Sequence, residues 1–287
     1  MIHIVTDSGA HFPTPHIAPN VTIVPNTLTM GGKTYREGLD LGSEESLRLI
    51  TAQNQIPAIV PPGVAEYTDV LTRLARDTDG IIVLPTSREL SQSWENASRA
   101  AEALSAHCPL MVIDSRTIST GLALLVKLAV RTIESGVDFD EVVRVTRGAV
   151  DRLYAVYFAE SMDYLMHNHI MPQSHSILGM MLGLKPVIAL EEGRIVPIEK
   201  VRTRTQGLDR IVEYAAEFTD IEDVMIAQPR IGITEGTRHL QERLAVEFPG
   251  RHFPHAIYGA SLAALIGVDA LGLIILEREG NLTDDDF

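Results

Sequence analysis

The chain has 287 residues, and its 24 Lys and Arg stand against 38 Asp and Glu, which gives a formal net charge of −14. Such an acidic protein is a poor partner for DNA, RNA or an anionic membrane surface, because binding to these begins with a positive surface. Hydrophobic residues make up 45% of the chain, which excludes wholesale disorder and is enough for the cores of two domains. We therefore expect a globular protein with no nucleic-acid partner.

Cysteine content and apolar runs narrow the cellular setting. The single cysteine, Cys108, excludes an internal disulfide and a cysteine-based metal site, and it favours a reducing cytoplasm. The longest apolar region, residues 260–276, contains Asp269. A membrane span needs about 20 apolar residues without such a carboxylate. We expect a cytoplasmic protein with no membrane span.

Strand-like runs alternate with helical patterns over the first half of the chain. We expect strands over residues 2–6, 21–24, 81–84 and 110–113, and helices over 43–53, 64–76, 90–105 and 121–136. This alternation predicts βαβ units, which form a mostly parallel sheet flanked by helices. Right-handed crossovers would place the carboxyl ends of these strands along one edge of the sheet.

Hydroxyl side chains gather where these strands end. Thr6, Ser8, Ser87 and Ser115 all lie at or just beyond a predicted strand. Ser and Thr often cap the first turn of a helix. Ligands of open α/β sheets, however, bind in the crevice outside the carboxyl ends of the strands. Both interpretations stay open, with capping the more common of the two.

Composition changes after a helix predicted over residues 139–152. A Met- and His-rich stretch follows a strand at 155–158, and the pattern around 191–194 is typical of a turn between antiparallel strands. We expect further helices at 208–217 and 238–248, and strands at 224–227 and 271–276. The sequence thus predicts two α/β domains: an N-terminal domain, 1–152, with the parallel sheet, and a C-terminal domain, 153–287, with a mixed sheet and helices.

Recognisable catalytic and cofactor motifs are missing. The chain has no G-x-S-x-G, no G-x-x-x-x-G-K-[ST] and no G-x-G-x-x-G. His167, His169 and His175 do not have zinc spacing, so we expect no metal, no cofactor and no catalytic residue. Two alternatives stay open: a small hydrolase or transferase that uses Asp7 and Asp114 in an interdomain crevice, and a scaffold protein with a degenerated pocket.

Several segments share their order and spacing with one known family. They are Ile4 to Ser8 with its T-D-S, Pro25 to Tyr35, Leu84 to Trp94, Ile113 to Ser115 followed by Gly121, Tyr164-Leu165, Leu178 to Pro186, and Gly193 to Arg202. Together they resemble the DegV family of bacterial fatty-acid-binding proteins. The resemblance implies two α/β domains that hold one fatty acid, with its carboxylate at the domain interface. It also implies a non-enzymatic carrier that presents the acid to a fatty acid kinase.

The headgroup ligands that the resemblance implies are partly replaced in this chain. Ser91 stands at the serine of the family's L-S-G-T segment, and Ser93 stands at its threonine. The family's T-S-Q-P segment is replaced by residues 59–62, which carry no hydroxyl. Ile170 occupies the place of an arginine and Leu265 that of a histidine.

Those replacements predict an altered headgroup site. A buried carboxylate that has lost its cation costs several kcal/mol. We therefore expect Ser91, Ser93 and His169 to supply the polar contacts, and the ligand to be a fatty acid or a neutral lipid held chiefly by its tail. A histidine can act as the cation because its ordinary pKa of about 6.5 lies close to neutral pH.

A tail pocket would supply most of the binding energy. A chain of about 15 methylenes gains on the order of 12 kcal/mol from burial, before ordering costs. Five methionines, at 162, 166, 171, 180 and 181, can adapt to an apolar ligand or simply fill a core. We expect the tail to contact Ile59, Ile170, Met171, Leu178, Met181 and Leu265.

Overall fold

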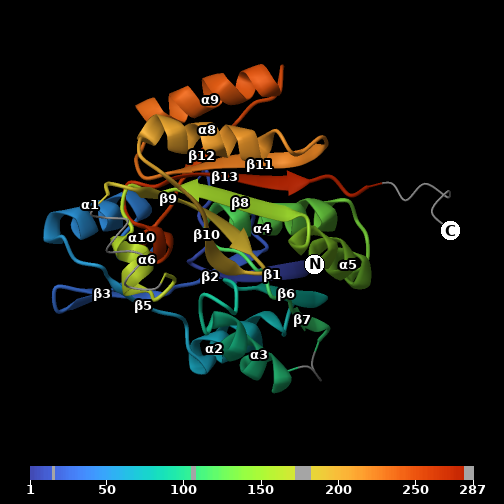
Figure 1. Cartoon of the computed structure of the whole chain (residues 1–287). Helices are drawn as coiled ribbons and strands as arrows, with labels where there is room; N and C mark the ends of the chain where they lie inside the picture. Colours follow the sequence, from blue (N-terminus) through green and yellow to red (C-terminus); the bar gives the residue numbers. More distant parts are fainter. Residues whose placement is uncertain (15–16, 105–107, 172–181, 281–287) are drawn as a thin grey trace.

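The computed structural model describes residues 1–14, 17–104, 108–171 and 182–280. Within them the chain forms a four-stranded sheet of order β2-β1-β6-β7, a six-stranded sheet of order β10-β9-β8-β13-β11-β12 and a three-stranded sheet of order β4-β3-β5. Figure 1 shows the two larger sheets stacked with helices below, between and above them. The mixed α/β fold expected from the sequence is confirmed. No helix in the described ranges is long and apolar enough to cross a membrane.

The four-stranded sheet is parallel throughout, as predicted. Its strands are β1 (Ile2–Asp7), β2 (Val21–Val24), β6 (Gly80–Leu84) and β7 (Leu110–Val112). The helices that cover it are α2 (Val64–Leu74), α3 (Ser93–Glu102), α4 (Thr120–Glu134) and α5 (Phe139–Val150). Val5 of β1 packs in the cluster with α2 and α3, whereas Ile4 packs in the cluster with α4 and α5. Both faces of the sheet are therefore buried, which explains its apolar strands.

The six-stranded sheet is mixed, as predicted. Its strands are β8 (Leu153–Phe158), β9 (Lys185–Glu191), β10 (Arg194–Val201), β11 (Ile221–Gln228), β12 (His255–Ile257) and β13 (Leu271–Glu277). β11 and β12 are parallel, and the other pairs are antiparallel. Two helices, α8 (Arg204–Ala215) and α9 (Glu235–Glu247), lie over one face (Figure 1).

Successive residues of β8 pack in two different hydrophobic clusters, one on each face of the sheet. Phe158 packs in the cluster formed with α8 and α9, whereas Tyr157 points into the cluster on the opposite face of the sheet. Between the two large sheets lies α4, which contacts β1 on one side and β8, β11 and β13 on the other. A helix buried on both sides must be apolar around most of its circumference, as the sequence of α4 is.

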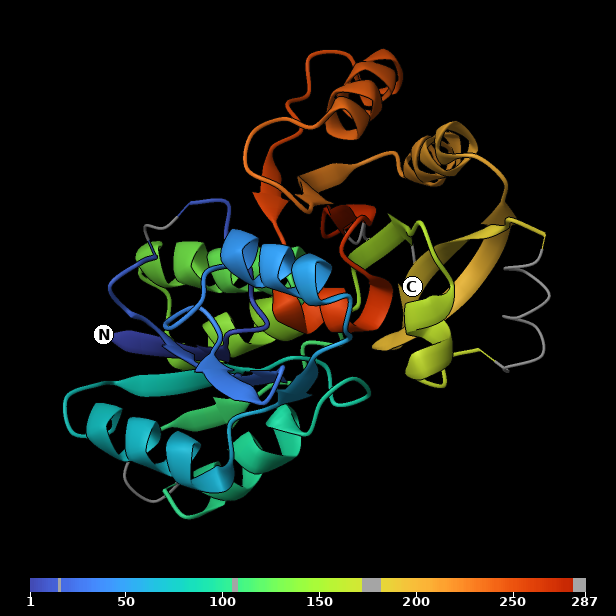
Figure 2. The ribbon, with the colours of Figure 1, turned by 90° about the vertical axis from the view of Figure 1, so that its left-hand side faces the viewer.

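The family resemblance of residues 25–35 implied a strand and a hairpin there, but a separate three-stranded sheet was not predicted. It contains β3 (Thr27–Met30), β4 (Lys33–Arg36) and β5 (Ala58–Val60), all antiparallel. β5 pairs with β3 about 30 residues earlier in the chain, and such a pairing leaves no local pattern in the sequence. The helices nearby are α1 (Ser43–Gln53), α6 (Asp163–His167) and α10 (Ala260–Ile266). Figure 2 shows α10 at the centre of the molecule, where it contacts α1, β5 and α6.

Element boundaries follow local capping and turn geometry. The turn between β9 and β10 is confirmed: Glu192 and Gly193 have φ of 47° and 80°, as a two-residue hairpin requires. α8 begins at Arg204, earlier than predicted, because Thr203 and Gln206 form a capping box there. The division of the chain into folding units at residues 152 and 153 stays a prediction.

Two helical glycines provide a matched test of this packing. A Cβ on Gly207 of α8 would lie 2.0 Å from the Phe158 ring, whereas a Cβ on Gly148 of α5 meets no atom within 4 Å. We expect Gly207→Ala to destabilise the fold by about 1–3 kcal/mol through overpacking. Gly148→Ala should stabilise it by about 0.5–1 kcal/mol through helix propensity. Urea unfolding measures both free energies, and equal signs would contradict the packing described.

Candidate functional site

A cleft of about 680 Å³ lies outside the carboxyl end of β6. It is bordered by β5, the loop after β6, the end of α6 and one side of α10. The residues that line it are Asn26, 57–61, Thr86, 88–92, Ile118, His167, Asn168, Ser261, Ala264 and Leu265. The cleft therefore occupies the position where ligands bind in open α/β sheets.

Three of the predicted site residues line this cleft, namely Ile59, Ser91 and Leu265. Ile170 and Met171 instead belong to the hydrophobic cluster beneath it, which also includes Ile59 and Leu265 at its border. Thus the predicted tail residues that the structure describes lie around one continuous apolar region. Their contacts with a ligand stay predictions.

Other predicted site residues lie apart from the cleft. His169 is exposed just after α6, where its φ of 55° lies in the left-handed region. Leu178 and Met181 fall outside the described residues, as does His175. Ser93 is completely buried at the start of α3 and is not among the residues that line the cleft.

Ser93 belongs to a network around the buried carboxylate of Asp7. Its Oγ donates to Asp7 Oδ2 at 2.5 Å and lies 2.7 Å from the Tyr67 hydroxyl. Asp7 also accepts from Thr86 N at 2.8 Å, from Thr86 Oγ1 at 2.7 Å and from Gly9 N at 2.9 Å. Burial raises the pKa of Asp7, although these hydrogen bonds oppose the shift. The hydroxyls at this end of β1 thus stabilise a carboxylate of the protein itself.

A second buried carboxylate, Glu37, lies between Asn26 and the first turn of α10. Only 4% of Glu37 is exposed. It accepts hydrogen bonds from Ser8 Oγ at 3.0 Å, from Asn26 Nδ2 at 3.1 Å, from Ser261 N at 2.8 Å and from Ser261 Oγ. His11 Nε2 is 3.7 Å from Glu37 Oε1. Glu37 therefore fixes the first turn of α10, which carries part of the cleft wall.

The pKa of Glu37 reflects these contacts. Burial alone would raise the pKa, but the nearby His11 and the hydrogen bonds from Ser261 outweigh burial and lower it. Sequence reasoning missed this residue, because Glu37 stands beside Arg36 and Gly38 and resembles an exposed turn carboxylate. Its partner Ser261 is 224 positions away, so no local pattern could reveal the pair.

The other hydroxyls at the strand ends are used internally as well. Thr6 Oγ1 donates to Leu84 O at 2.6 Å, and Ser115 Oγ donates to Thr117 O at 3.2 Å. Ser87 Oγ donates at 2.9 Å to Gly193 O in the turn of the β9–β10 hairpin. These contacts hold loops together, so the capping role favoured from the sequence is wrong for these residues.

The two carboxylates of the hydrolase or transferase alternative accept hydrogen bonds within the protein. Asp7 is enclosed by its donors, and Asp114 accepts from the backbone N–H groups of Arg88 and Arg116. Among the described residues, no group of three or more His, Cys, Asp or Glu side chains could hold a metal ion. The cleft is lined by apolar residues of β5 and α10 together with polar residues of the loop after β6, a mixture that suits the binding of an amphipathic ligand.

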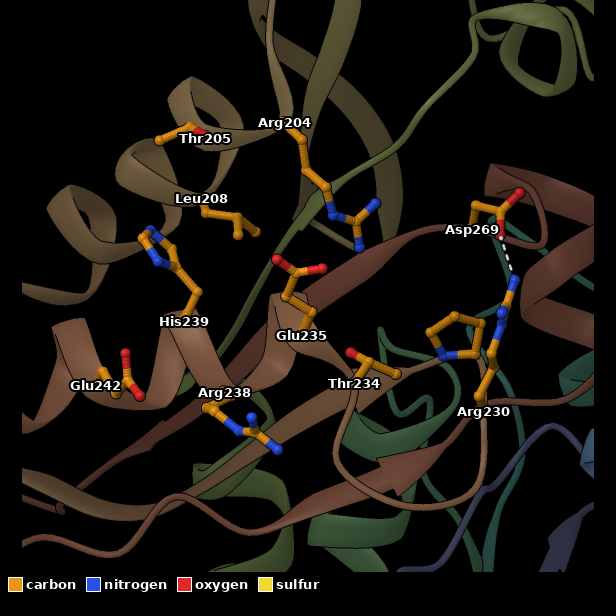
Figure 3. A pocket seen from close by; sticks show the side chains of 12 residues that line it. Arg204, Thr205, Leu208, Arg230, Thr234, Glu235, Arg238, His239, Glu242 and Asp269 are labelled. Carbon is orange, nitrogen blue, oxygen red and sulfur yellow. Dashed lines mark ion pairs between the residues drawn. The ribbon is translucent and has the colours of Figure 1, made fainter.

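A second cleft, of about 580 Å³, lies where α8 and α9 begin (Figure 3). Two of its three arginines are paired with carboxylates: Arg204 with Glu160, and Arg230, which lies 3.7 Å from Asp269. Glu235 extends between Arg204 and the other side chains in Figure 3. The charges of this cleft largely balance, and its walls are polar. It does not match a site for a long apolar ligand.

Comparison with known proteins agrees with this geometry. A family model described as an uncharacterised protein of the DegV family matches residues 1–278. The chain belongs to the DegV family. A DegV domain-containing protein of Streptomyces coelicolor is 30% identical over 280 residues, which cover 96% of this chain and 99% of that protein.

Two solved DegV structures share the fold. The fatty acid binding DegV family protein from Streptococcus agalactiae has a TM-score of 0.86 at 24% identity, with 97% of this chain and 99% of that chain covered. The fatty acid kinase B3 protein of Streptococcus pneumoniae, loaded with linoleic acid, has a TM-score of 0.84 at 18% identity, with 96% and 99% covered. The family resemblance and the fold drawn from the sequence are thereby confirmed.

Substitutions of Ser93 and Ser91 test the assignment of Ser93 to the buried Asp7 network and of Ser91 to the cleft wall. Ser93→Ala removes a donor from Asp7 and a partner from Tyr67, so we expect a loss of about 1–3 kcal/mol in the free energy of unfolding. Ser91 accepts one hydrogen bond, from Ser93 N at 3.2 Å, and it borders the cleft. Ser91→Ala should cost less than about 1 kcal/mol. Urea unfolding separates the two, and similar losses would refute the assignment.

Acid should selectively weaken the contact between Glu37 and α10. The folded-state pKa of Glu37 is lowered, so its stabilisation is full above the ordinary carboxyl pKa of about 4.3 and is lost as pH falls below it. Glu37→Gln should cost about 3 kcal/mol near neutral pH and progressively less in acid. Both proteins are unfolded by urea across this range. A difference between the two proteins that does not change with pH would contradict the prediction.

Proposed function

We propose that this DegV-family chain binds a long-chain fatty acid or a related lipid, with its polar end in the cleft and its tail in the hydrophobic cluster beneath. One observation carries the proposal: the cleft is continuous with that cluster, because Ile59, Ile118 and Leu265 belong to both. Solved relatives of the same fold are named for bound fatty acids, which supports the choice of ligand.

The polar end meets few free donors in this cleft. Thr86 Oγ1 donates to Asp7, and the Asn26 amide and the Ser261 hydroxyl donate to Glu37. Asn168 Nδ2 donates to Ala264 O at 2.8 Å and to Tyr164 O at 2.7 Å. What remains for a headgroup is Ser91, together with the more exposed side chains of Arg88, Gln92 and His167. Burial of the tail therefore supplies most of the affinity, in line with the altered headgroup positions.

A carrier role follows from a site of this kind. The cleft binds without an evident catalytic group, and one relative of the same fold is a fatty acid kinase B protein. We include in the proposal that this chain acts in the cytoplasm as a non-enzymatic carrier, and that a fatty acid kinase acts on the acid it holds. The hydrolase and scaffold alternatives have no observation in their favour.

Placing a charge in the cleft tests the binding proposal. Leu265→Glu puts a carboxylate beside the path of the tail, so we expect at least a tenfold loss of affinity for stearic acid. Val246→Glu is the matched control, because Val246 on α9 is 74% exposed and is not among the residues that line the cleft. Titration calorimetry, with native mass spectrometry of purified protein, measures binding. If folded wild-type protein holds no acyl chain, the proposal fails.

A kinase assay tests the carrier role separately. Wild-type protein loaded with radiolabelled acid is incubated with a fatty acid kinase and ATP, and acyl phosphate is measured. Product formation that Leu265→Glu abolishes and Val246→Glu leaves intact would support the role. Tight binding without any product would show a lipid-binding protein that has lost its kinase partner.

A further inference from the structure

One buried tyrosine hydroxyl in the proposed tail region has no hydrogen-bond partner among the residues that the structure describes. Tyr67, Tyr157 and Tyr258 are the largest fully buried side chains of the described residues. The Tyr67 hydroxyl lies 2.7 Å from Ser93 Oγ. The Tyr258 hydroxyl donates to Gly267 O at 3.1 Å and accepts from Ala270 N at 3.0 Å. The Tyr157 hydroxyl makes no hydrogen bond to any residue that the structure describes, although only 2% of Tyr157 is exposed.

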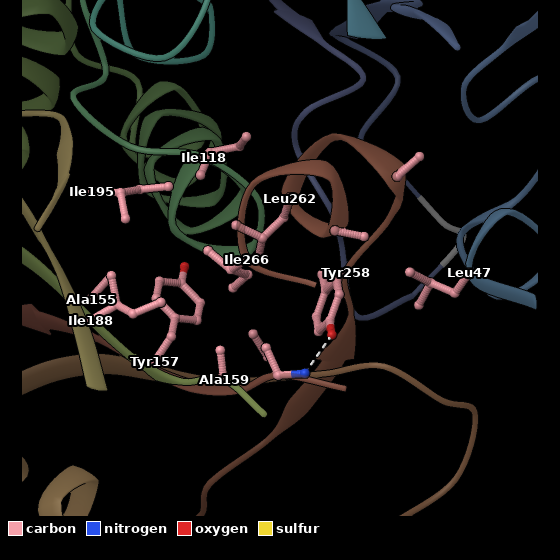
Figure 4. Packing of buried hydrophobic residues seen from close by; sticks show 14 of the residues in the cluster. Leu47, Ile118, Ala155, Tyr157, Ala159, Ile188, Ile195, Tyr258, Leu262 and Ile266 are labelled. Carbon is pink, nitrogen blue, oxygen red and sulfur yellow. Dashed lines mark hydrogen bonds between the residues drawn. The ribbon is translucent and has the colours of Figure 1, made fainter. Parts of the chain in front are cut away.

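The position of this hydroxyl is fixed by the sheet. Tyr157 pairs in register with Gly272 of β13, and a Cβ on Gly272 would lie 2.1 Å from the tyrosine ring. The ring therefore lies flat against the backbone of the neighbouring strand and cannot turn toward solvent. Figure 4 shows the hydroxyl directed toward Ile118, among Ile195 and Ile266. Burial raises its pKa, so the group is a neutral phenol that can donate and accept.

Tyr157 does not line the cleft but belongs to the hydrophobic cluster that borders it. Ile118 lines the cleft and also packs in the cluster that contains Tyr157. Because the hydroxyl is directed toward Ile118, a tail that enters the cluster from the cleft along Ile118 would approach the hydroxyl. A saturated hydrocarbon chain offers this phenol no hydrogen bond, and leaving a buried donor unpaired is costly. A chain that carries an oxygen atom at the right depth supplies the missing partner.

We propose that the preferred ligand of this protein is an oxygenated long-chain fatty acid, whose hydroxyl or keto group forms a hydrogen bond with the hydroxyl of Tyr157. This inference rests on the proposed function and narrows its ligand class. Ring packing against Gly272 sets the depth of the phenol, so the protein should select one region of the chain for the oxygen. Tyr157 is thus a specificity-determining residue of the tail pocket.

Titrations with stearic acid and its positional hydroxy and keto isomers test the inference. We expect the best isomer to bind wild-type protein about tenfold more tightly than stearic acid, which corresponds to about 1.4 kcal/mol at 25 °C. Tyr157→Phe keeps the ring and removes the hydroxyl. It should abolish this preference, leave the affinity for stearic acid unchanged or improved, and not lower the melting temperature.

Tyr67→Phe is the matched control. It removes an equally buried hydroxyl from the separate cluster around α2 and α3. Because Ser93 loses a partner, this variant should melt at a lower temperature yet keep the preference for the oxygenated isomer. Equal affinity of wild-type protein for stearic acid and every isomer would overturn the inference, as would a preference that survives Tyr157→Phe. Both outcomes leave the proposed function standing, whereas failure to bind any acyl chain refutes the proposed function itself.

Discussion

The buried carboxylate of Glu37 is the constraint on which the cleft depends. A charge removed from water is tolerated only where several donors surround it. Here the donors come from three separate segments: Ser8 after β1, Asn26 between β2 and β3, and Ser261 in α10. No segment can shift without leaving the charge unsatisfied. The cleft wall on α10 is therefore fixed relative to the parallel sheet, although the two are distant in the sequence.

The same constraint shapes what the cleft can bind. Asp7 and Glu37 together engage the hydroxyls of Thr86 and Ser261 and the amide of Asn26, which line the cleft. These donors of the cleft lining are hydrogen-bonded to carboxylates of the protein, so few of them are available to a ligand. An anionic headgroup gains little there, so selectivity must come from the apolar region below. The net charge of −14 acts in the same direction, because it offers no general attraction for an anion.

Features with a local cause could be predicted from the sequence. The strand and helix alternation, the turn at Glu192-Gly193 and the apolar helix α4 each depend on neighbouring residues, and the structure contains them. Glu37 and Ser93 could not be assigned, because their surroundings are built from distant segments. Ser93 matches a family position for a ligand contact, yet its hydroxyl is bonded to Asp7, 86 positions away. The family resemblance led us to expect a ligand contact at Ser93, but it could not reveal that the Ser93 hydroxyl donates to Asp7.

Buried polar groups in this molecule differ in how they are satisfied. Asp7, Glu37, Tyr67 and Tyr258 all have protein partners, most of them from distant segments, and each thereby joins parts of the chain. The Tyr157 hydroxyl links no two segments of the chain, since it has no hydrogen-bond partner among the described residues. A phenylalanine would pack the same ring against Gly272 without an unpaired donor. Stability alone therefore does not account for the hydroxyl, whereas a hydrogen bond to a ligand that passes Ile118 does.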